Sequence, residues 1–172
     1  AEMPSARELL EQADALMREA IAALVQWQQR VPYEGLPAYA GSKLHDGLAL
    51  FPTWCVEREF GVAWTAAERE RWQRVCEALV AGMDAQPRVA VHRDWMPRNL
   101  MVSTPNPAIL DFQDAAAGPI AYDMASLIRD AFISWDEERE IDWSVRYWEA
   151  ARRAGLPVAD DFGDFWRALE WC

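Results

Sequence analysis

The 172-residue sequence predicts a mainly α-helical fold with a small β-hairpin region. Long segments at both ends of the chain repeat apolar residues at helical spacing. Two of these segments open with capping boxes, Ser5 with Glu8 and Thr65 with Glu68. Across residues 88–112 the pattern changes to short apolar runs divided by Pro and Asn, which is typical of short strands with tight connections.

Three amphipathic helices are expected in the first half of the chain. The first begins after Ser5, the second runs from Ser42 towards Pro52, and the third follows Thr65. Gly47 argues against the second helix, because glycine inside a helix costs about 1 kcal/mol of stability relative to alanine. The three helices precede the segment that carries the most informative residues.

Short strands and further helices are expected after these three. The segments RVAVH, NLMVS and AILDF predict strands, and STPNP predicts the turn between the last two. After AAAGP the helical pattern returns in two segments, the second of which closes on Gly155 as its C′ residue. A last helix is expected from near Asp161, with the chain stopping inside it. At this length, residues 1–172 are expected to form one domain.

The composition is that of a globular protein, with 52% hydrophobic residues, 26% charged residues and ten Trp. No stretch of eighteen apolar residues and no basic region followed by an apolar one occurs, so we expect no membrane span, no signal peptide and a cytoplasmic location. The three Cys lack CxxC spacing, which favours reduced thiols. The formal net charge of −11 disfavours nucleic acid as a partner.

Four polar residues cluster around the predicted strands. His92, Asp94 and Asn99 stand at H-x-D-x-x-x-x-N spacing, and Asp111 follows the next apolar run. Asn99 and Asp111 would flank a hairpin, so their oxygens can converge, and two oxygen ligands together with phosphate oxygens suit Mg²⁺. An unpaired aspartate nearby could accept a hydroxyl proton. This division of roles is that of phosphoryl transfer.

Taken singly, each of these residues has a simpler explanation. Asp and Asn are common in turns because they hydrogen-bond their own backbone, and a single His is more often a core residue than a catalyst. The combined pattern of loop, strand, turn, strand and Asp-Phe is far more specific and favours the functional interpretation. For His92 itself we expect a structural role, in which it hydrogen-bonds the backbone and holds the loop.

The segments HRDWMPRN and LDFQD together resemble the catalytic and metal-binding loops of the protein-kinase-like fold. The D-F-G and A-P-E motifs of protein kinases are absent, and LDFQD with GPIAYDMASLIRD is instead similar to the aminoglycoside phosphotransferase family of small-molecule kinases. Within it, the two segments most resemble bacterial anomeric kinases that phosphorylate N-acetylmuramate and N-acetylglucosamine in cell-wall recycling. The resemblance covers nearly the whole chain and implies the C-terminal lobe of this fold, with ATP and Mg²⁺ as cofactors.

The resemblance also implies residue roles. Asp94 would be the catalytic base, while Asn99 and Asp111 would hold Mg²⁺ and through it the nucleotide. His92 would brace the loop. Asp123, in YDMASL, matches an acidic helix residue that hydrogen-bonds the catalytic-loop backbone, so we expect it to be buried and structural.

Other polar and aromatic residues are weaker candidates. Asp114 could support the site from behind or cap the following helix. Arg93 and Arg98 could meet phosphate, although solvated charges near a loop are the more common explanation. A sugar substrate needs polar groups and an aromatic face, for which the candidates are Asp46, Trp54, Tyr122, Asp130 and Trp135.

The sequence departs from the family in one respect. The Gly-rich loop, the strand lysine and its glutamate partner, which belong to an N-terminal nucleotide-binding lobe, are absent from these 172 residues. The single lysine, Lys43, lies in a predicted helix. We therefore expect an isolated C-terminal lobe that binds ATP poorly and is inactive alone.

Alternatives remain open for both substrate and function. An aminoglycoside kinase is compatible with the acidic charge, and a choline- or homoserine-like kinase is the other small-molecule alternative. A non-catalytic helical binding module with relic kinase loops is a hypothesis from another class. Apolar surface left by an absent lobe could also drive dimerisation.

Overall fold

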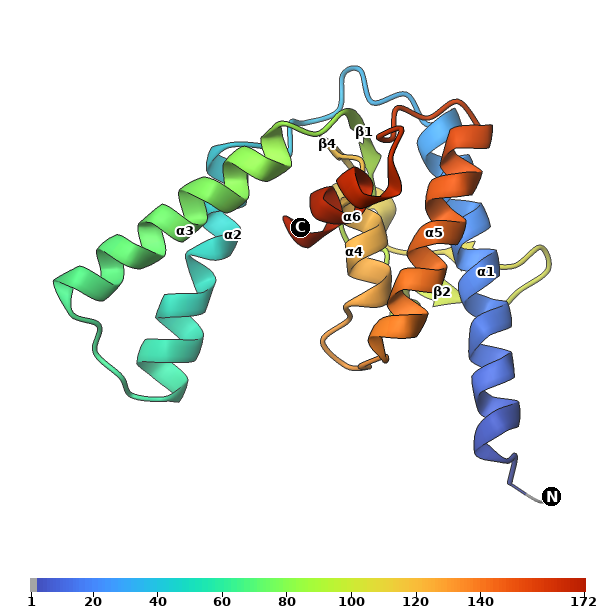
Figure 1. Cartoon of the computed structure of the whole chain (residues 1–172), viewed down its shortest axis with the longest axis horizontal. Helices are drawn as coiled ribbons and strands as arrows, with labels where there is room; N and C mark the ends of the chain where they lie inside the picture. Colours follow the sequence, from blue (N-terminus) through green and yellow to red (C-terminus); the bar gives the residue numbers. More distant parts are fainter. Residues whose placement is uncertain (1–2) are drawn as a thin grey trace.

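The computed structural model describes residues 3–172 as a helical body from which a helical arm projects (Figure 1). The body contains α1 (Ala6–Arg30), α4 (Tyr122–Ile128), α5 (Glu137–Arg153) and α6 (Phe162–Glu170). The arm consists of α2 (Ser42–Leu48), the π-type helix η1 (Phe51–Glu59) and α3 (Ala66–Asp84). Apart from the short strands, the chain is mainly helical, as its periodicity predicts.

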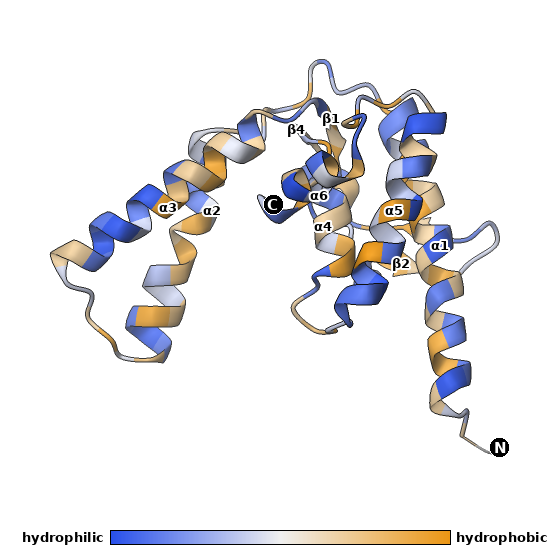
Figure 2. Cartoon of the chain, viewed as in Figure 1, coloured by the Kyte–Doolittle hydropathy of each residue, from blue (hydrophilic) through white to orange (hydrophobic). Residues whose placement is uncertain are grey.

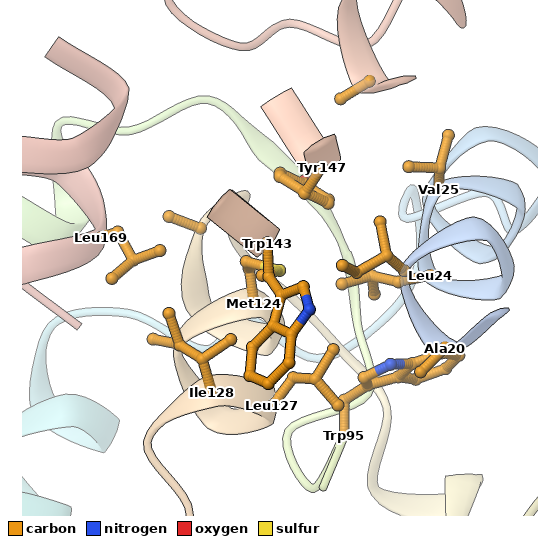
Figure 3. Close-up of a cluster of buried hydrophobic side chains, with 14 of the residues drawn as sticks. Ala20, Leu24, Val25, Trp95, Met124, Leu127, Ile128, Trp143, Tyr147 and Leu169 are labelled. Carbon is orange, nitrogen blue, oxygen red and sulfur yellow. The ribbon is translucent and has the colours of Figure 1, made fainter. Parts of the chain in front are cut away.

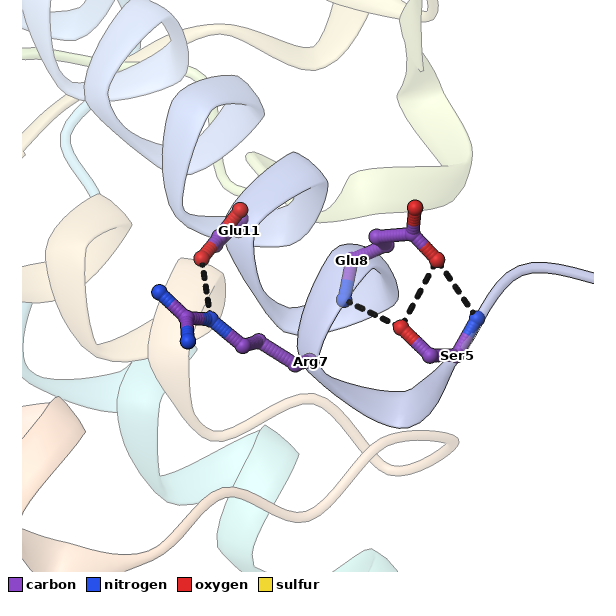
Figure 4. Close-up of polar contacts among 4 residues, drawn as sticks. All are labelled: Ser5, Arg7, Glu8 and Glu11. Atoms are coloured by element: carbon purple, nitrogen blue, oxygen red, sulfur yellow. Dashed lines mark hydrogen bonds and ion pairs between the residues drawn. The ribbon is translucent and has the colours of Figure 1, made fainter.

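The helix starts that the capping boxes predict are confirmed. The Ser5 hydroxyl accepts from the Glu8 backbone N–H at 3.3 Å, and the Ser5 N–H donates to the Glu8 carboxylate at 2.8 Å (Figure 4). One turn along, the Arg7 guanidinium pairs with Glu11 at 2.8 Å. Thr65 caps α3 in the same way. Each cap satisfies backbone donors that the helix itself leaves unpaired.

The arm differs from the sequence-based expectation of one helix ending near Pro52. The α2 helix already ends at Leu48, and a wider π-type helix, η1, then continues to Glu59. Pro52 lies in the first turn of η1, where its missing N–H removes no helical hydrogen bond. The ring of Phe51 packs on that of Trp72 in α3, with centroids 5.2 Å apart, and this contact joins the two sides of the arm.

Two small antiparallel sheets support the loops between the helices. Strand β1 (Arg88–Val91) pairs with β4 (Ala116–Pro119), and β2 (Leu100–Met101) pairs with β3 (Ala108–Ile109). The three strands that the sequence predicts are present, although shorter than the apolar runs. Strand β4 was not expected, because its Ala and Gly residues have low strand propensity.

Gly118 explains how β4 comes so close to β1. A Cβ atom at this position would lie 2.6 Å from Cγ2 of Val91 and 3.4 Å from Cβ of Tyr39. The separation from Val91 is well below the ~3.5–4.0 Å of a favourable carbon contact, whereas that from Tyr39 is an ordinary contact. Pairing of β4 with β1 therefore requires glycine at position 118. This requirement comes from packing between segments distant in the sequence, so local strand propensity does not indicate it.

The main hydrophobic core lies between α1, α4, α5 and α6 (Figure 3). Trp143 and Tyr147 of α5 are buried in it, and their polar atoms are satisfied by Asp14 and Gln28 of α1 at 2.9 and 2.6 Å. Hydrophobic and hydrophilic residues alternate around α1, as expected for a helix with one buried face (Figure 2). Trp95, from the loop after β1, is fully buried in the same core and anchors that loop.

The helix ends agree with the sequence in one case and differ in another. Gly155 follows α5 with φ of 75°, the left-handed conformation expected of a C′ glycine. The helix α6 ends at Glu170, so the prediction that the chain stops inside a helix is wrong by two residues. None of the helices within residues 3–172 is both long and apolar enough to span a membrane.

Candidate active site

The loop that follows β1 is held by its own backbone. The Asp94 carbonyl accepts hydrogen bonds from the Met96 N–H and from the Asn99 side-chain amide, both at 2.9 Å. The Asn99 N–H in turn donates to the Met96 carbonyl at 2.9 Å. Together with the buried Trp95, these bonds fix the positions of Asp94 and Asn99 relative to each other.

The carboxylate of Asp94 is available for chemistry. The residue is partly exposed, and within residues 3–172 its carboxylate takes part in no hydrogen bond or ion pair. An aspartate in this state can accept both a hydrogen bond and a proton from an incoming hydroxyl group. The sequence motif predicted such a free carboxylate at this position.

Asp123 supports the loop from the buried side. Its carboxylate is fully buried at the start of α4 and accepts the backbone N–H groups of His92 at 2.7 Å and Arg93 at 2.9 Å. Burial raises the pKa of Asp123 to about 7, although these two hydrogen bonds oppose the change. The expected burial and backbone contacts of Asp123 are thus observed. They hold Arg93 in a left-handed conformation with φ of 79°, which is uncommon outside glycine.

The side chain of His92 does not make the expected hydrogen bond. Its ring is fully buried and meets the edges of Trp27 and Trp95, with centroids 5.6 and 5.5 Å away. Neither ring nitrogen has a partner of normal hydrogen-bond geometry among the described residues, although the Leu110 carbonyl lies close enough to oppose the fall in pKa. Burial lowers the pKa of His92, so the imidazole is neutral at pH 7. It braces the loop by aromatic packing and not, as the sequence suggested, by hydrogen bonding.

The hairpin of β2 and β3 brings Asn99 and Asp111 to the same end. The Leu110 N–H donates to the Asn99 carbonyl at 3.0 Å, directly beside Asp111. Asp111 has φ of 65°, and one of its carboxylate oxygens accepts from the Gln113 amide at 2.8 Å. The second oxygen of Asp111 and the side-chain oxygen of Asn99 stay free in the described chain.

These oxygens fit a hard divalent cation. Mg²⁺ takes one or two protein ligands and completes its octahedron with water and phosphate oxygens. Residues 3–172 contain no group of three His, Cys, Asp or Glu side chains that could hold a metal without such help. A Mg²⁺ ion that arrives with a nucleotide could therefore bind the Asp111 carboxylate and the Asn99 amide oxygen at this end of the hairpin.

Asp114 does not cap the following helix. The N-cap of α4 is Ala121, and no side chain bonds to the first N–H groups of that helix. Asp114 instead ends the short 3₁₀ helix η3 (Phe112–Asp114), and its carbonyl lies 3.5 Å from a guanidinium nitrogen of Arg93. This excludes one of the two roles predicted for Asp114.

A cavity of about 530 Å³ opens between the arm and the loops of the candidate site. Its polar lining comes from Tyr39, Lys43, Asp46, Arg93, Gln113 and Asp114. Asp46 is thus the member of the predicted substrate set that lines this space. Tyr39, Lys43 and Gln113 were missed, because nothing in the local sequence indicates that residues 37–50 lie beside the loops.

Two predicted substrate residues are engaged elsewhere. Trp54 lies in η1 with the Arg58 guanidinium 4.0 Å from its ring centre. Tyr122 shares a hydrogen bond of 3.0 Å with the hydroxyl of Tyr39, so that Tyr39 and not Tyr122 reaches the cavity wall. Burial raises the pKa of Tyr122 far above its usual value, which keeps its hydroxyl neutral.

The remaining two predicted substrate residues lie between α4 and α5. The Asp130 carboxylate accepts the backbone N–H of Phe132 at 3.1 Å. The ring of Trp135 meets Trp143 edge-on with centroids 5.0 Å apart, at the margin of the core. Neither lines the cavity, so their proposed contact with substrate is still only a prediction.

The chain is similar to a described family and to named relatives. The model of a phosphotransferase enzyme family matches residues 2–162. An N-acetylmuramate/N-acetylglucosamine kinase of Pseudomonas putida is 48% identical over 159 residues, which cover 92% of this chain and 47% of that protein. The kinase of the same name from Neisseria meningitidis is 47% identical over 157 residues, covering 91% and 47%. The chain thus spans about half the length of the curated relatives that it matches.

Two solved structures share the fold at low sequence identity. A macrolide 2′-phosphotransferase of type I aligns with a TM-score of 0.52 at 15% identity, over 91% of this chain and 50% of that one. An aminoglycoside phosphotransferase of Streptomyces rimosus, solved with ADP and streptomycin, aligns with a TM-score of 0.54 at 17% identity, over 98% and 64%. These likenesses confirm the predicted fold class, a mainly helical chain with a small β-hairpin region and a kinase-like fold.

Proposed function

This chain belongs to the phosphotransferase enzyme family, and from that premise we propose that it carries the catalytic and metal-binding half of a sugar kinase. The observation that supports the proposal most is the unpaired Asp94 carboxylate. Asn99 fixes the backbone carbonyl of Asp94 beside the hairpin end that presents Asp111. These three side chains are the minimum that phosphoryl transfer to a hydroxyl group requires of this lobe.

Asp94 is the proposed base. It accepts the proton of the acceptor hydroxyl as that oxygen attacks the γ-phosphorus of ATP, while the bond from this phosphorus to the bridging oxygen breaks and ADP leaves. The fixed backbone of Asp94 directs the nucleophile. Asn99 and Asp111 would hold Mg²⁺, which neutralises charge on the nucleotide phosphates when it is bound. Asp123 and Trp95 do not touch the substrate; they keep the loop in place through backbone hydrogen bonds and burial.

The proposed acceptor is N-acetylmuramate or N-acetylglucosamine, phosphorylated at the anomeric hydroxyl during cell-wall recycling. The names of the relatives at 47–48% identity support this choice. The cavity lined by Arg93, the residue before Asp94, supports it further, because about 530 Å³ lies within the ~300–1,000 Å³ usual for small-molecule sites. ATP is the proposed phosphate donor, and the cytoplasm, where ATP is supplied, is the proposed location.

The 172 residues alone are proposed to bind nucleotide weakly. They contain no Gly-rich loop and no strand lysine, and Lys43 lies on α2 at the cavity. Met101, Val102 and Phe112 are exposed beside the hairpin, which supports packing of further protein there, either a nucleotide-binding lobe or a second copy. Calorimetric titration with Mg·ATP tests this, and micromolar affinity in the 172-residue chain would contradict it.

A substrate panel tests the proposed function. The longest natural protein that contains this chain is incubated with Mg·ATP and, separately, N-acetylmuramate, N-acetylglucosamine, choline, homoserine and kanamycin, and products are identified by ³¹P NMR. We expect phosphate on the anomeric oxygen of an N-acetyl sugar. Turnover of kanamycin, choline or homoserine in place of both sugars would refute the proposal.

A further inference from the structure

Two cationic side chains face the cavity without a carboxylate partner. Lys43 approaches from α2 in the arm, and Arg93 from the loop that carries Asp94. Neither takes part in any of the ion pairs of residues 3–172, although most arginines in this acidic chain do. Two cations without an ion-pair partner therefore line the same cavity.

Arg93 is held in place before any ligand arrives. Its guanidinium carbon lies 4.8 Å from the ring centre of Tyr39, and the Tyr39 hydroxyl is fixed by Tyr122. A guanidinium nitrogen contacts the Asp114 carbonyl at 3.5 Å, and the buried Nε has no hydrogen-bond partner among the described residues. The cation is thus preorganised by an aromatic ring and a carbonyl, neither of which neutralises it.

The cavity also contains negative charge. Asp46 and Asp114 line it, so the two cations and two carboxylates sum to zero, whereas the whole chain carries −11. A polycation such as an aminoglycoside would meet Lys43 and Arg93 unfavourably. An acceptor with one carboxylate and several hydroxyls matches both signs, because its carboxylate can face the cations while its hydroxyls donate to Asp46 and Asp114.

We propose that Lys43, together with Arg93, binds a carboxylate group of the acceptor sugar and so makes the site prefer an acidic N-acetyl sugar over a neutral one. N-acetylmuramate carries such a carboxylate on its lactyl ether, and N-acetylglucosamine does not. This inference rests on the proposed sugar kinase function and deepens it. Lys43 is exposed, so its contribution is screened by salt and modest in size.

The test compares two sugars in one protein. The ratio of kcat/KM for N-acetylmuramate to that for N-acetylglucosamine is measured in the longest natural protein, in Lys43→Met and in Lys43→Arg. An exposed charge pair near 1 kcal/mol corresponds to a roughly fivefold change, so Lys43→Met should lower the ratio about fivefold, mainly through KM. Lys43→Arg should restore it. Arg71→Gln, which removes an exposed cation of α3 outside the cavity, is the matched control and should leave the ratio unchanged.

Ionic strength gives an independent measurement. The wild-type ratio should fall between 20 and 500 mM NaCl, since screening weakens only the contact with the charged sugar. It should fall less in Lys43→Met, where Arg93 alone faces the carboxylate. A ratio that is the same in wild type and Lys43→Met overturns the inference and leaves the proposed function standing. A wild-type protein that phosphorylates neither sugar overturns both.

Discussion

Replacing Gly118 by alanine perturbs the packing of β4 against β1, the strand that leads into the loop of the candidate site. The added methyl group would lie 2.6 Å from Cγ2 and 3.3 Å from Cγ1 of Val91, which is fully buried at the end of β1. The nearer contact is about 1 Å shorter than a favourable one. Either β1 and β4 must separate or Val91 must leave its rotamer, and overpacking of this kind costs about 1–3 kcal/mol. We expect Gly118→Ala to lower the free energy of unfolding by that amount in urea titrations followed by circular dichroism.

Gly47→Ala is the matched control for this substitution. Its Cβ would meet no atom within 4 Å. Alanine also gains about 1 kcal/mol of helix propensity inside α2. Combining Gly118→Ala with Val91→Ala should recover stability relative to the sum of the single changes. A Gly118→Ala protein no less stable than Gly47→Ala would refute the reasoning that links Gly118 to strand pairing.

Three further predictions concern single side chains. Burial raises the pKa of Asp123 from 3.8 to about 7, so the folded state binds the Asp123 proton more tightly than the unfolded state does. The free energy of unfolding should therefore fall by at most ~4 kcal/mol as pH rises from about 4 to 7. In urea titrations, Asp123→Asn should flatten this decline. Asp111→Asn should weaken Mn²⁺ binding about tenfold or more, as measured by electron paramagnetic resonance. The control Asp160→Asn, on the surface, should leave Mn²⁺ affinity unchanged. Equal Mn²⁺ affinity in the wild type and Asp111→Asn would remove Asp111 from the metal site. Trp95→Ala should lower the free energy of unfolding by about 3–5 kcal/mol, whereas Trp54→Ala, at an exposed position, should lower it by less than about 0.5 kcal/mol. Similar losses in the two variants would contradict the role of Trp95 as a buried anchor of the loop.

The fold was predictable where local chemistry determines it. The capping residues Ser5 and Thr65 mark helix starts, and Gly155 marks a helix end, because each satisfies backbone groups of its own turn. Strand β4 was not predictable in this way, since Ala-Ala-Gly-Pro becomes a strand only when β1 lies beside it. The extent of η1 beyond Pro52 was likewise missed, because a proline in the first turn does not stop a helix.

The candidate site was likewise predictable only where local sequence determines it. Asp94, Asn99 and Asp111 were predicted as candidates because a linear motif and one hairpin place them. Lys43 and Tyr39 were not, because they reach the cavity through the packing of the arm against the loops, and this packing has no local sequence signal. The aromatic packing of His92 depends in the same way on Trp27, which lies far away in the sequence.

The most direct test of the account is the rate of phosphate transfer from Mg·ATP to N-acetylmuramate by the longest natural protein containing this chain, compared with its Asp94→Asn variant. Loss of a general base predicts a fall in kcat of about 10²–10⁴-fold with an unchanged circular dichroism spectrum. Asp142→Asn, which breaks an exposed pair with Arg146, should retain full activity. An Asp94→Asn protein that phosphorylates the sugar at the wild-type rate would contradict the central claim.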